Sequence, residues 1–214
     1  MPTDPKIPDG PAAESFRTAV ETGDAESLLS LLEGDERLRA SIDEPLFSFG
    51  KPAVVQAAGS GHREVIEILL EFRADIDRLS AWGPGGFGVL HATCFEHPEL
   101  ASWLLERGAR VDCHAASGLG DLDRLRQLLE EEPEAIDQRG PDGQFPLHFA
   151  ANIDVAELLL RQGAQLDARC LDHHSTAAQW ALQRAPDVSR YLIEQGARCD
   201  IFLAVALGEQ GGGR

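Results

Sequence analysis

No stretch of this sequence is long and apolar enough to cross a membrane as a helix. A spanning helix needs about 20 consecutive apolar residues, and the 214 residues contain no such run. The opening sequence, MPTDPKIPDGPA, also lacks the apolar core that a signal peptide requires. We therefore expect no association with membranes and a cytoplasmic location.

Cysteine and positive charge are both scarce. The four cysteines, Cys94, Cys113, Cys170 and Cys199, form no C-x-x-C pair, which is typical of free thiols in a reducing compartment. Lysine and arginine total 19 against 36 for aspartate and glutamate, and the formal net charge is -17. Such an acidic surface repels phosphate backbones, so we expect no nucleic-acid partner.

The common catalytic signatures are absent as well. The sequence contains no G-x-S-x-G motif, no glycine-rich loop ending in Lys-Ser or Lys-Thr, and no dinucleotide-binding fingerprint. We therefore expect a protein that is not an enzyme and that needs no cofactor.

The stretch that the rest of the chain copies covers residues 142–167. Pro146 opens a short helix at a position where its missing N–H costs nothing. Apolar residues then recur at helical spacing until Gly163 ends a second helix as a left-handed cap. Two short antiparallel helices cannot bury an apolar face alone, so this unit makes sense only as one layer of a stack.

A hydrophobic residue followed by aspartate closes each copy of the unit. The aspartates are Asp43, Asp77, Asp112, Asp137, Asp167 and Asp200, which lie 34, 35, 25, 30 and 33 residues apart by subtraction. They define about six layers and a partial seventh. Layers one, four and seven are compact, with the turns Gly23-Asp24, Gly120-Asp121 and Gly208-Glu209, whereas the other layers begin with long loops.

Two of the layers carry motifs that resemble the ankyrin repeat. The motifs are Phe145-Pro146-Leu147-His148 with Gly163-Ala164, and Val89-Leu90-His91 with Gly108-Ala109. The resemblance implies an all-α, ankyrin-type solenoid of stacked helix-turn-helix repeats with short hairpin-like loops over residues 13–209. We expect one stack with a continuous core, between a flexible leader at residues 1–12 and a flexible tail at residues 210–214.

The chain departs from this repeat pattern at several positions. Arg73 replaces the glycine of the left-handed cap, so the backbone there is either strained or diverted into another turn. Gln179 stands where the motif histidine would fall. The turn between the two helices of layer five is shorter than the pattern, so we expect the first helix of that layer to be truncated.

The resemblance also implies a function, because such repeats generally bind other proteins through their loop tips and through the first helices, which line a concave face. We therefore predict a non-catalytic module that binds a protein partner. Aromatic and arginine side chains often dominate interfaces, and the candidate contact residues are Phe47, Phe49, Lys51, Trp82, Phe87, Arg139, Asp142, Phe145, Leu171, His173 and His174. The alternative for Phe49, Phe87 and Phe145 is packing within the protein.

Histidines could also support catalysis or metal binding. In the repeat motif, the histidine at positions 91 and 148 bonds neighbouring loops, and we favour that structural role for His91 and His148. Two clusters could each supply three metal ligands. They are Cys170 with His173 and His174, and Cys94 with His91 and His97. Structural zinc sites use four ligands. We therefore expect no metal site.

The apolar residues 201–207 begin a seventh layer that has no second helix. An apolar helix is a poor solvent-facing end, so we expect this end to fray, to associate with another copy, or to continue in a longer parent chain. The third alternative would make the protein a regulatory or targeting segment of a larger enzyme.

Overall fold

The computed structural model of the protein describes residues 10–208. Residues 1–9 of the predicted leader and the predicted tail at 210–214 lie outside the described residues. Within residues 10–208 the chain forms α-helices and short 3-10 helices, with two isolated β-bridges and no strand. No helix in this part of the chain has both the length and the apolar character needed to span a membrane.

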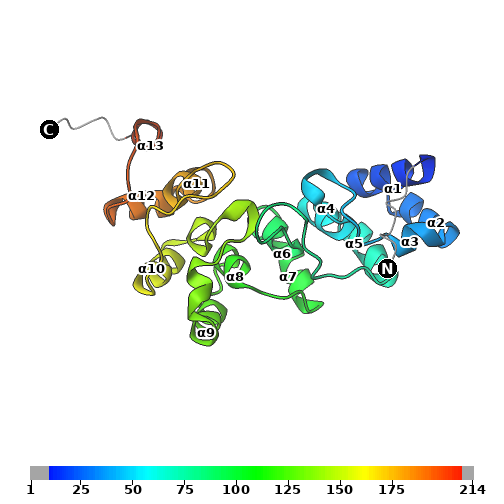
Figure 1. Ribbon diagram of the computed structural model, residues 1–214, viewed down its shortest axis with the longest axis horizontal. Coiled ribbons are helices and arrows are strands. Elements are labelled where there is room, and N and C mark those ends of the chain that lie inside the picture. Colours follow the sequence, from blue (N-terminus) through cyan, green and yellow to red (C-terminus); the bar gives the residue numbers. More distant parts are fainter. Residues whose placement is uncertain (1–9, 209–214) are drawn as a thin grey trace, which may run out of the picture. The chain divides into compact units, whose positions relative to one another are not determined.

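The helices follow the predicted layers along the chain (Figure 1). The α-helices are α1 (Pro11–Thr22), α2 (Ala25–Gly34), α3 (Glu36–Ala40), α4 (Ala53–Gly59), α5 (Arg63–Glu71), α6 (Val89–Thr93), α7 (Pro98–Glu106), α8 (Cys113–Leu119), α9 (Leu122–Glu131), α10 (Ile153–Arg161), α11 (Ala177–Arg184), α12 (Pro186–Glu194) and α13 (Ile201–Ala206). The 3-10 helices are η1 (Ser48–Gly50), η2 (Pro133–Asp137), η3 (Pro141–Gly143) and η4 (Pro146–Phe149).

The chain folds into two compact units, which we describe separately. The first contains the described residues up to Trp82 together with residues 86–110, and the second contains residues 83–85 and the described residues from Val111 onward. Layers one to three belong to the first unit and layers four to seven to the second. A continuous core through all the layers stays a prediction.

Helix pairs α1/α2, α4/α5 and α6/α7 build the first unit. The pairing of α1 with α2 is set by their turn, where Gly23 adopts a left-handed conformation with φ 78° and Asp24 caps α2 by accepting the N–H of Ser27. Helix α1 begins at Pro11, so residues 11 and 12 are helical and do not belong to the predicted leader. The apolar faces are fully buried, including Phe16, Leu28, Leu32, Ile66, Leu69 and Leu104.

Helix pairs α8/α9 and α11/α12 and the pair η4/α10 build the second unit, with α13 packed against α11. The truncation of the first helix in layer five is confirmed, since η4 is a single 3-10 turn of four residues. Leu125, Leu159, Leu192 and Leu203 each lie in a different layer, and all belong to one buried apolar cluster. Consecutive layers of this unit therefore share one core.

Five of the six aspartates that close the layers take one of two hydrogen-bonding roles. Before a long-loop layer it ties its own layer to the next one: the carboxylates of Asp43, Asp77 and Asp167 accept the N–H groups of Asp75, Arg110 and Arg198, respectively. Before a compact layer it caps the following helix instead. Asp112 accepts the N–H of Ala115 at 2.8 Å, and Asp200 accepts the N–H of Leu203 at 2.9 Å.

The motif histidine fixes the start of a first helix and contacts the next loop, as its structural role predicts. In His148, Nδ1 accepts the N–H of Phe145 at 3.3 Å and Nε2 donates to the carbonyl of Ser175 at 3.1 Å. Burial lowers the pKa of His148 to about 4, so the ring is neutral at pH 7. Gln179 replaces this histidine in layer six: its Oε1 accepts the N–H of Thr176, and its Nε2 donates to Asp200.

Arg73 takes the left-handed position rather than avoiding it. Its φ is 69°, and it follows α5 at the place where Gly108, Gly163 and Gly196 follow other second helices with φ between 86° and 101°. A side chain with a Cβ atom is disfavoured in this conformation, so the backbone at Arg73 is strained.

Candidate partner-binding loops

Two long loops lie side by side in the first unit. They lead into α4 and α6, and the N–H of Ala81 donates to the carbonyl of Gly50 at 2.8 Å. Gly50, with φ 60°, leaves no room for a side chain, because an added Cβ would lie 2.9 Å from the Cβ of Ala81. The close approach of the loops therefore depends on glycine at this position.

Phe47 is buried, which argues against the prediction that its side chain contacts a partner. Its N–H donates to the carbonyl of Lys51 across a tight turn, which directs the ring inward, and the residue is only 7% exposed. The turn places Phe49 at its apex, with φ 61° and 53% of the residue exposed. The two phenylalanines thus have opposite environments although only one residue separates them.

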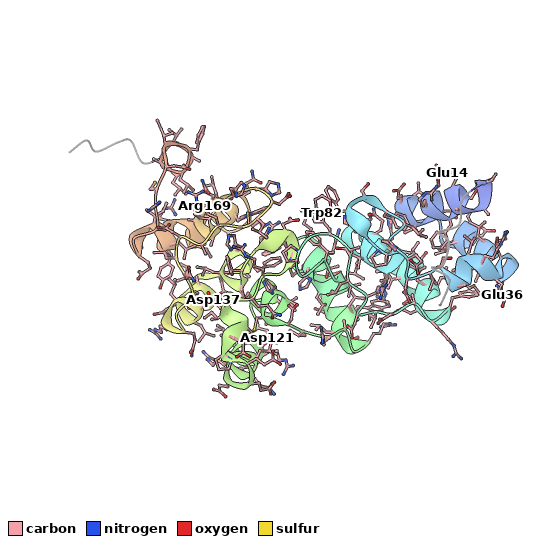
Figure 2. All side chains as sticks on the ribbon, in the orientation of Figure 1. Glu14, Glu36, Trp82, Asp121, Asp137 and Arg169 are labelled. Carbon is pink, nitrogen blue, oxygen red and sulfur yellow. The ribbon has the colours of Figure 1, made fainter. Side chains whose placement is uncertain are left out.

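Phe49 and Trp82 form an exposed aromatic pair across the two loops. Their ring centroids are 5.1 Å apart at an interplanar angle of 84°, and Trp82 is 38% exposed. The Nζ atom of Lys51 lies 5.8 Å from the centroid of the Phe49 ring, within the range of a cation–π interaction. We call Phe49, Lys51 and Trp82 the aromatic tip; Figure 2 labels Trp82 on its loop.

The loops that lead into η4 and α11 form a similar pair in the second unit. The N–H of Leu171 donates to the carbonyl of Asp142 at 3.1 Å, and the Arg139 guanidinium donates to the carbonyls of Gly143 and Arg169. The guanidinium also stacks over the ring of Phe145, with its carbon 4.4 Å from the centroid. Nη1 of Arg139 therefore links the two loops of this pair.

The remaining predicted contact residues differ in exposure. Leu171, His173 and His174 are exposed, whereas Lys51, Phe87, Arg139, Asp142 and Phe145 are half-buried. The alternative of packing within the protein thus fits Phe87 and Phe145 better than Phe49. Sequence reasoning missed two exposed residues of the loop before α6, Arg78 and Leu79, because neither is aromatic and no motif marks them.

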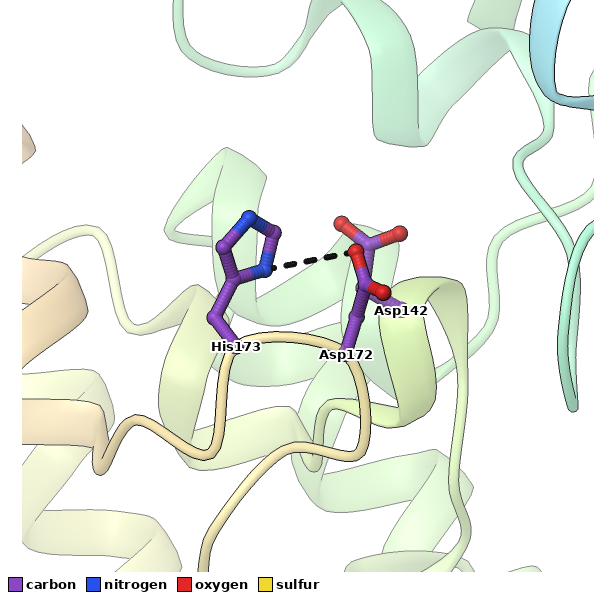
Figure 3. Close-up of side chains that lie close together, drawn as sticks. All are labelled: Asp142, Asp172 and His173. Carbon is purple, nitrogen blue, oxygen red and sulfur yellow. Dashed lines mark ion pairs between the residues drawn. The ribbon is translucent and has the colours of Figure 1, made fainter.

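Asp142, Asp172 and His173 come together at the tip of the second loop pair (Figure 3). Each offers one potential ligand atom, and these atoms lie within 4.8 Å of one another. Nδ1 of His173 is 3.5 Å from a carboxylate oxygen of Asp172, and both side chains are exposed. Three ligands on loops, two of them exposed, fall short of the four that structural zinc sites use, so we assign no metal here.

The cluster of Cys170 with His173 and His174, which the sequence offered as metal ligands, does not form a common site. Cys170 is 1% exposed, and its sulfur accepts the N–H of Ser175 and the indole N–H of Trp180. The ring of His173 packs edge-on against Trp180, at 5.3 Å between centroids. The structure thus places Cys170 in the interior and His173 at the surface, so these two candidate ligands lie in different environments.

The fold and its loops define a class of protein, an all-α ankyrin-type solenoid with projecting loop pairs. The family profile described as ankyrin repeats (3 copies) matches residues 16–115 and 113–202. The chain therefore belongs to the ankyrin repeat family.

Two relatives illustrate how this repeat domain occurs elsewhere. The chain is 27% identical over 130 residues to "Ankyrin repeat and SAM domain-containing protein 6" of Rattus norvegicus, a match that covers 51% of this chain and 15% of the relative. It is 29% identical over 116 residues to "E3 ubiquitin-protein ligase Ufd4" of Drosophila melanogaster, covering 53% of this chain and 4% of the ligase. The chain thus spans a small part of each relative. Ankyrin repeats are generally modules for protein–protein interaction.

Proposed function

We propose that the protein is a non-catalytic, cytoplasmic module that binds a protein partner through its loop pairs and the adjoining first helices. The exposed Phe49–Trp82 pair is the observation that carries the proposal. Aromatic side chains bury a large area at low cost in rotamer entropy, and these two are held in place by the loop–loop hydrogen bond and by their own contact. In the second unit, the proposed contacts are Leu171, His173 and His174, with Arg139, Asp142 and Phe145 behind them.

The backbone at Phe49 supports this proposal. A phenylalanine with φ near +60° costs about 1 kcal/mol or more relative to glycine, and here the strain displays an aromatic ring to solvent. Burial in the core does not offset that cost. Strain of this kind is concentrated at binding and catalytic sites.

Affinity capture from a cell lysate, with quantitative mass spectrometry, tests the proposal. The bait proteins are the wild type, the double variant Phe49→Ala/Trp82→Ala, and a control, Leu29→Ala. Leu29 is an exposed apolar residue of α2 in the same unit. Proteins retained by the wild type and the control but lost by the double variant would support binding through the aromatic tip. Equal retention by all three, or no specific retention by the wild type, would contradict it.

Self-association through α13 is a second proposal, which rests on a different surface. Ile201, Phe202 and Val205 of this helix are between 73% and 79% exposed. At the matching positions of α8, Cys113, His114 and Ser117 are buried. Sedimentation equilibrium of the wild type and of Phe202→Glu tests this proposal. A dimer that the substitution dissociates is the expected result, and a wild type that is monomeric at about 100 µM would refute it, because such an interface would be weaker than micromolar.

The alternative of a regulatory or targeting segment within a larger enzyme has less support. Of the two relatives above, one is a ubiquitin ligase by name, and the match covers 4% of that protein. A match of this extent assigns no catalytic residue to this chain.

A further inference from the structure

Two segments of the first unit, which include the contacting parts of the first loop pair, contain no carboxylate side chain. No aspartate or glutamate occurs between Glu44 and Glu64 or between Asp77 and Glu96, although the chain has 36 acidic residues against 19 lysines and arginines. These segments comprise the part of each loop that follows Glu44 or Asp77, together with the first helices α4 and α6. The acidic character of the chain is thus interrupted at the surface that we propose for binding.

Two cations lie on these loops. Lys51 belongs to the aromatic tip, where its ammonium group faces a ring. Arg78 is exposed, and its Nε donates to the backbone carbonyl of Asp43 at 3.3 Å. Asp43 is half-buried, and its carboxylate accepts the N–H of Asp75. The positive charge of Arg78 also favours the ionised form of this carboxylate. Both loops therefore present a positive group next to exposed apolar surface.

The apolar part of this surface is larger than the aromatic tip alone. Leu79 follows Arg78 on the same loop and is 41% exposed. The positive groups and the apolar groups thus alternate along two adjacent loops. A partner that buries an apolar side chain here must bring its neighbouring residues close to Lys51 or Arg78.

We infer that the aromatic tip binds an acidic segment of a partner protein that carries a bulky apolar side chain. The inference rests on the proposed function. The apolar side chain packs against Phe49 and Trp82, and flanking carboxylates lie near Lys51 and Arg78. The net charge of the whole chain does not prevent this, because at physiological ionic strength charges are screened over about 8 Å, so the local groups decide which partner is favoured. A basic segment would meet two like charges here, and like-charge contacts disfavour a partner.

Selection from a displayed library of random linear peptides tests the inference. The library is panned against the full-length wild type at about 150 mM salt, the condition to which the screening length applies. It is also panned against Phe49→Ala/Trp82→Ala and the control Leu29→Ala. The expected result is enrichment, on the wild type and on the control only, of peptides in which aspartate or glutamate flanks an aromatic or large aliphatic residue.

A selected peptide then allows the charges to be tested directly. We expect Lys51→Glu/Arg78→Glu to weaken its binding by about tenfold or more. Arg37→Glu/Arg126→Glu, which makes the same change in net charge at exposed sites on α3 and α9, should leave the affinity within about twofold. A version of the peptide with asparagine and glutamine in place of its acidic residues should bind the wild type more weakly by a similar factor.

The possible outcomes separate the inference from the proposed function. Enrichment of basic or uncharged peptides that still need Phe49 and Trp82 would overturn the inference and leave the proposed function intact. Enrichment that the double variant retains would contradict both. If no peptide is enriched, the inferred acidic segment is wrong, and the lysate capture decides the proposed function.

Discussion

Replacing Arg73 with glycine should stabilise the protein, although the substitution removes a complete side chain. Arg73 holds φ 69° directly after α5, where its N–H donates to the carbonyl of Leu70. A left-handed conformation costs a residue with a Cβ about 1–2 kcal/mol. Glycine removes this cost but gains about 0.5–1 kcal/mol of conformational entropy in the unfolded chain. The net stabilisation is therefore about 0.5–1 kcal/mol, and the backbone hydrogen bond is retained.

Thermal and urea unfolding of three variants would measure this effect. For a chain of this size, the expected rise in Tm for Arg73→Gly is about 1–4 °C. Arg73→Ala keeps the strained Cβ and should stay within about 0.5 kcal/mol of the wild type.

Gly163→Ala provides the reverse test, because an added Cβ at Gly163 meets no atom within 4 Å while φ is 101°. It should cost about 1 kcal/mol or more from the backbone alone. If Arg73→Gly proves no more stable than Arg73→Ala, the assignment of strain to Arg73 is wrong.

Three further predictions concern other parts of the fold. The buried His148 should make stability depend on pH: its pKa is about 4 in the folded protein and 6.5 in the unfolded chain, so up to about 3 kcal/mol present above pH 6.5 is lost as the pH falls toward 4. His148→Gln should flatten the dependence of Tm on pH over this range, and an unchanged slope would contradict the prediction. Gly143→Ala should destabilise the second loop pair by about 2 kcal/mol, because the new Cβ would lie 2.7 Å from Leu171 at a φ of 65°; faster amide exchange at Leu171 would report it. Asp112→Ala should cost about 1 kcal/mol in urea unfolding through the lost cap of α8, and a smaller loss than for the exposed Asp123→Ala would refute that role.

The repeat itself could be predicted from the sequence, because its signals are local. Gly163 is predicted to end a second helix as a left-handed cap, and it follows α10 with φ 101°. The short turn of layer five predicted a truncated first helix, and η4 is a single turn. Helix α3 was missed, because its short sequence, Glu36–Ala40, is mainly polar and its only fully buried side chain is that of Leu38.

The candidate site was harder to predict, because it depends on contacts between distant residues. Phe47 and Phe49 have the same chemistry, and only the turn between them decides that one ring is buried and the other exposed. The approach of Asp142 to Asp172 depends on the register of two loops, which the hydrogen bond from Leu171 to Asp142 sets. Sequence periodicity carries no information about such a register. The absence of acidic residues from positions 45–63 and 78–95 can be read from the sequence, but only the structure shows that the loops in these two segments lie side by side.

The two roles of the closing aspartate bear on how a repeat of this kind can be lengthened or shortened. Its carboxylate finds a donor either three residues ahead, in a helix that follows at once, or in the next layer after a long loop. A loop can therefore be inserted or removed directly behind the aspartate without leaving that carboxylate unpaired. Removal of residues 78–88 would place Asp77 directly before α6, at the cap position that Asp112 holds before α8, and would exchange its bond to Arg110 for a local one. Long loops can thus be gained or lost one layer at a time while the helices that support them stay in place.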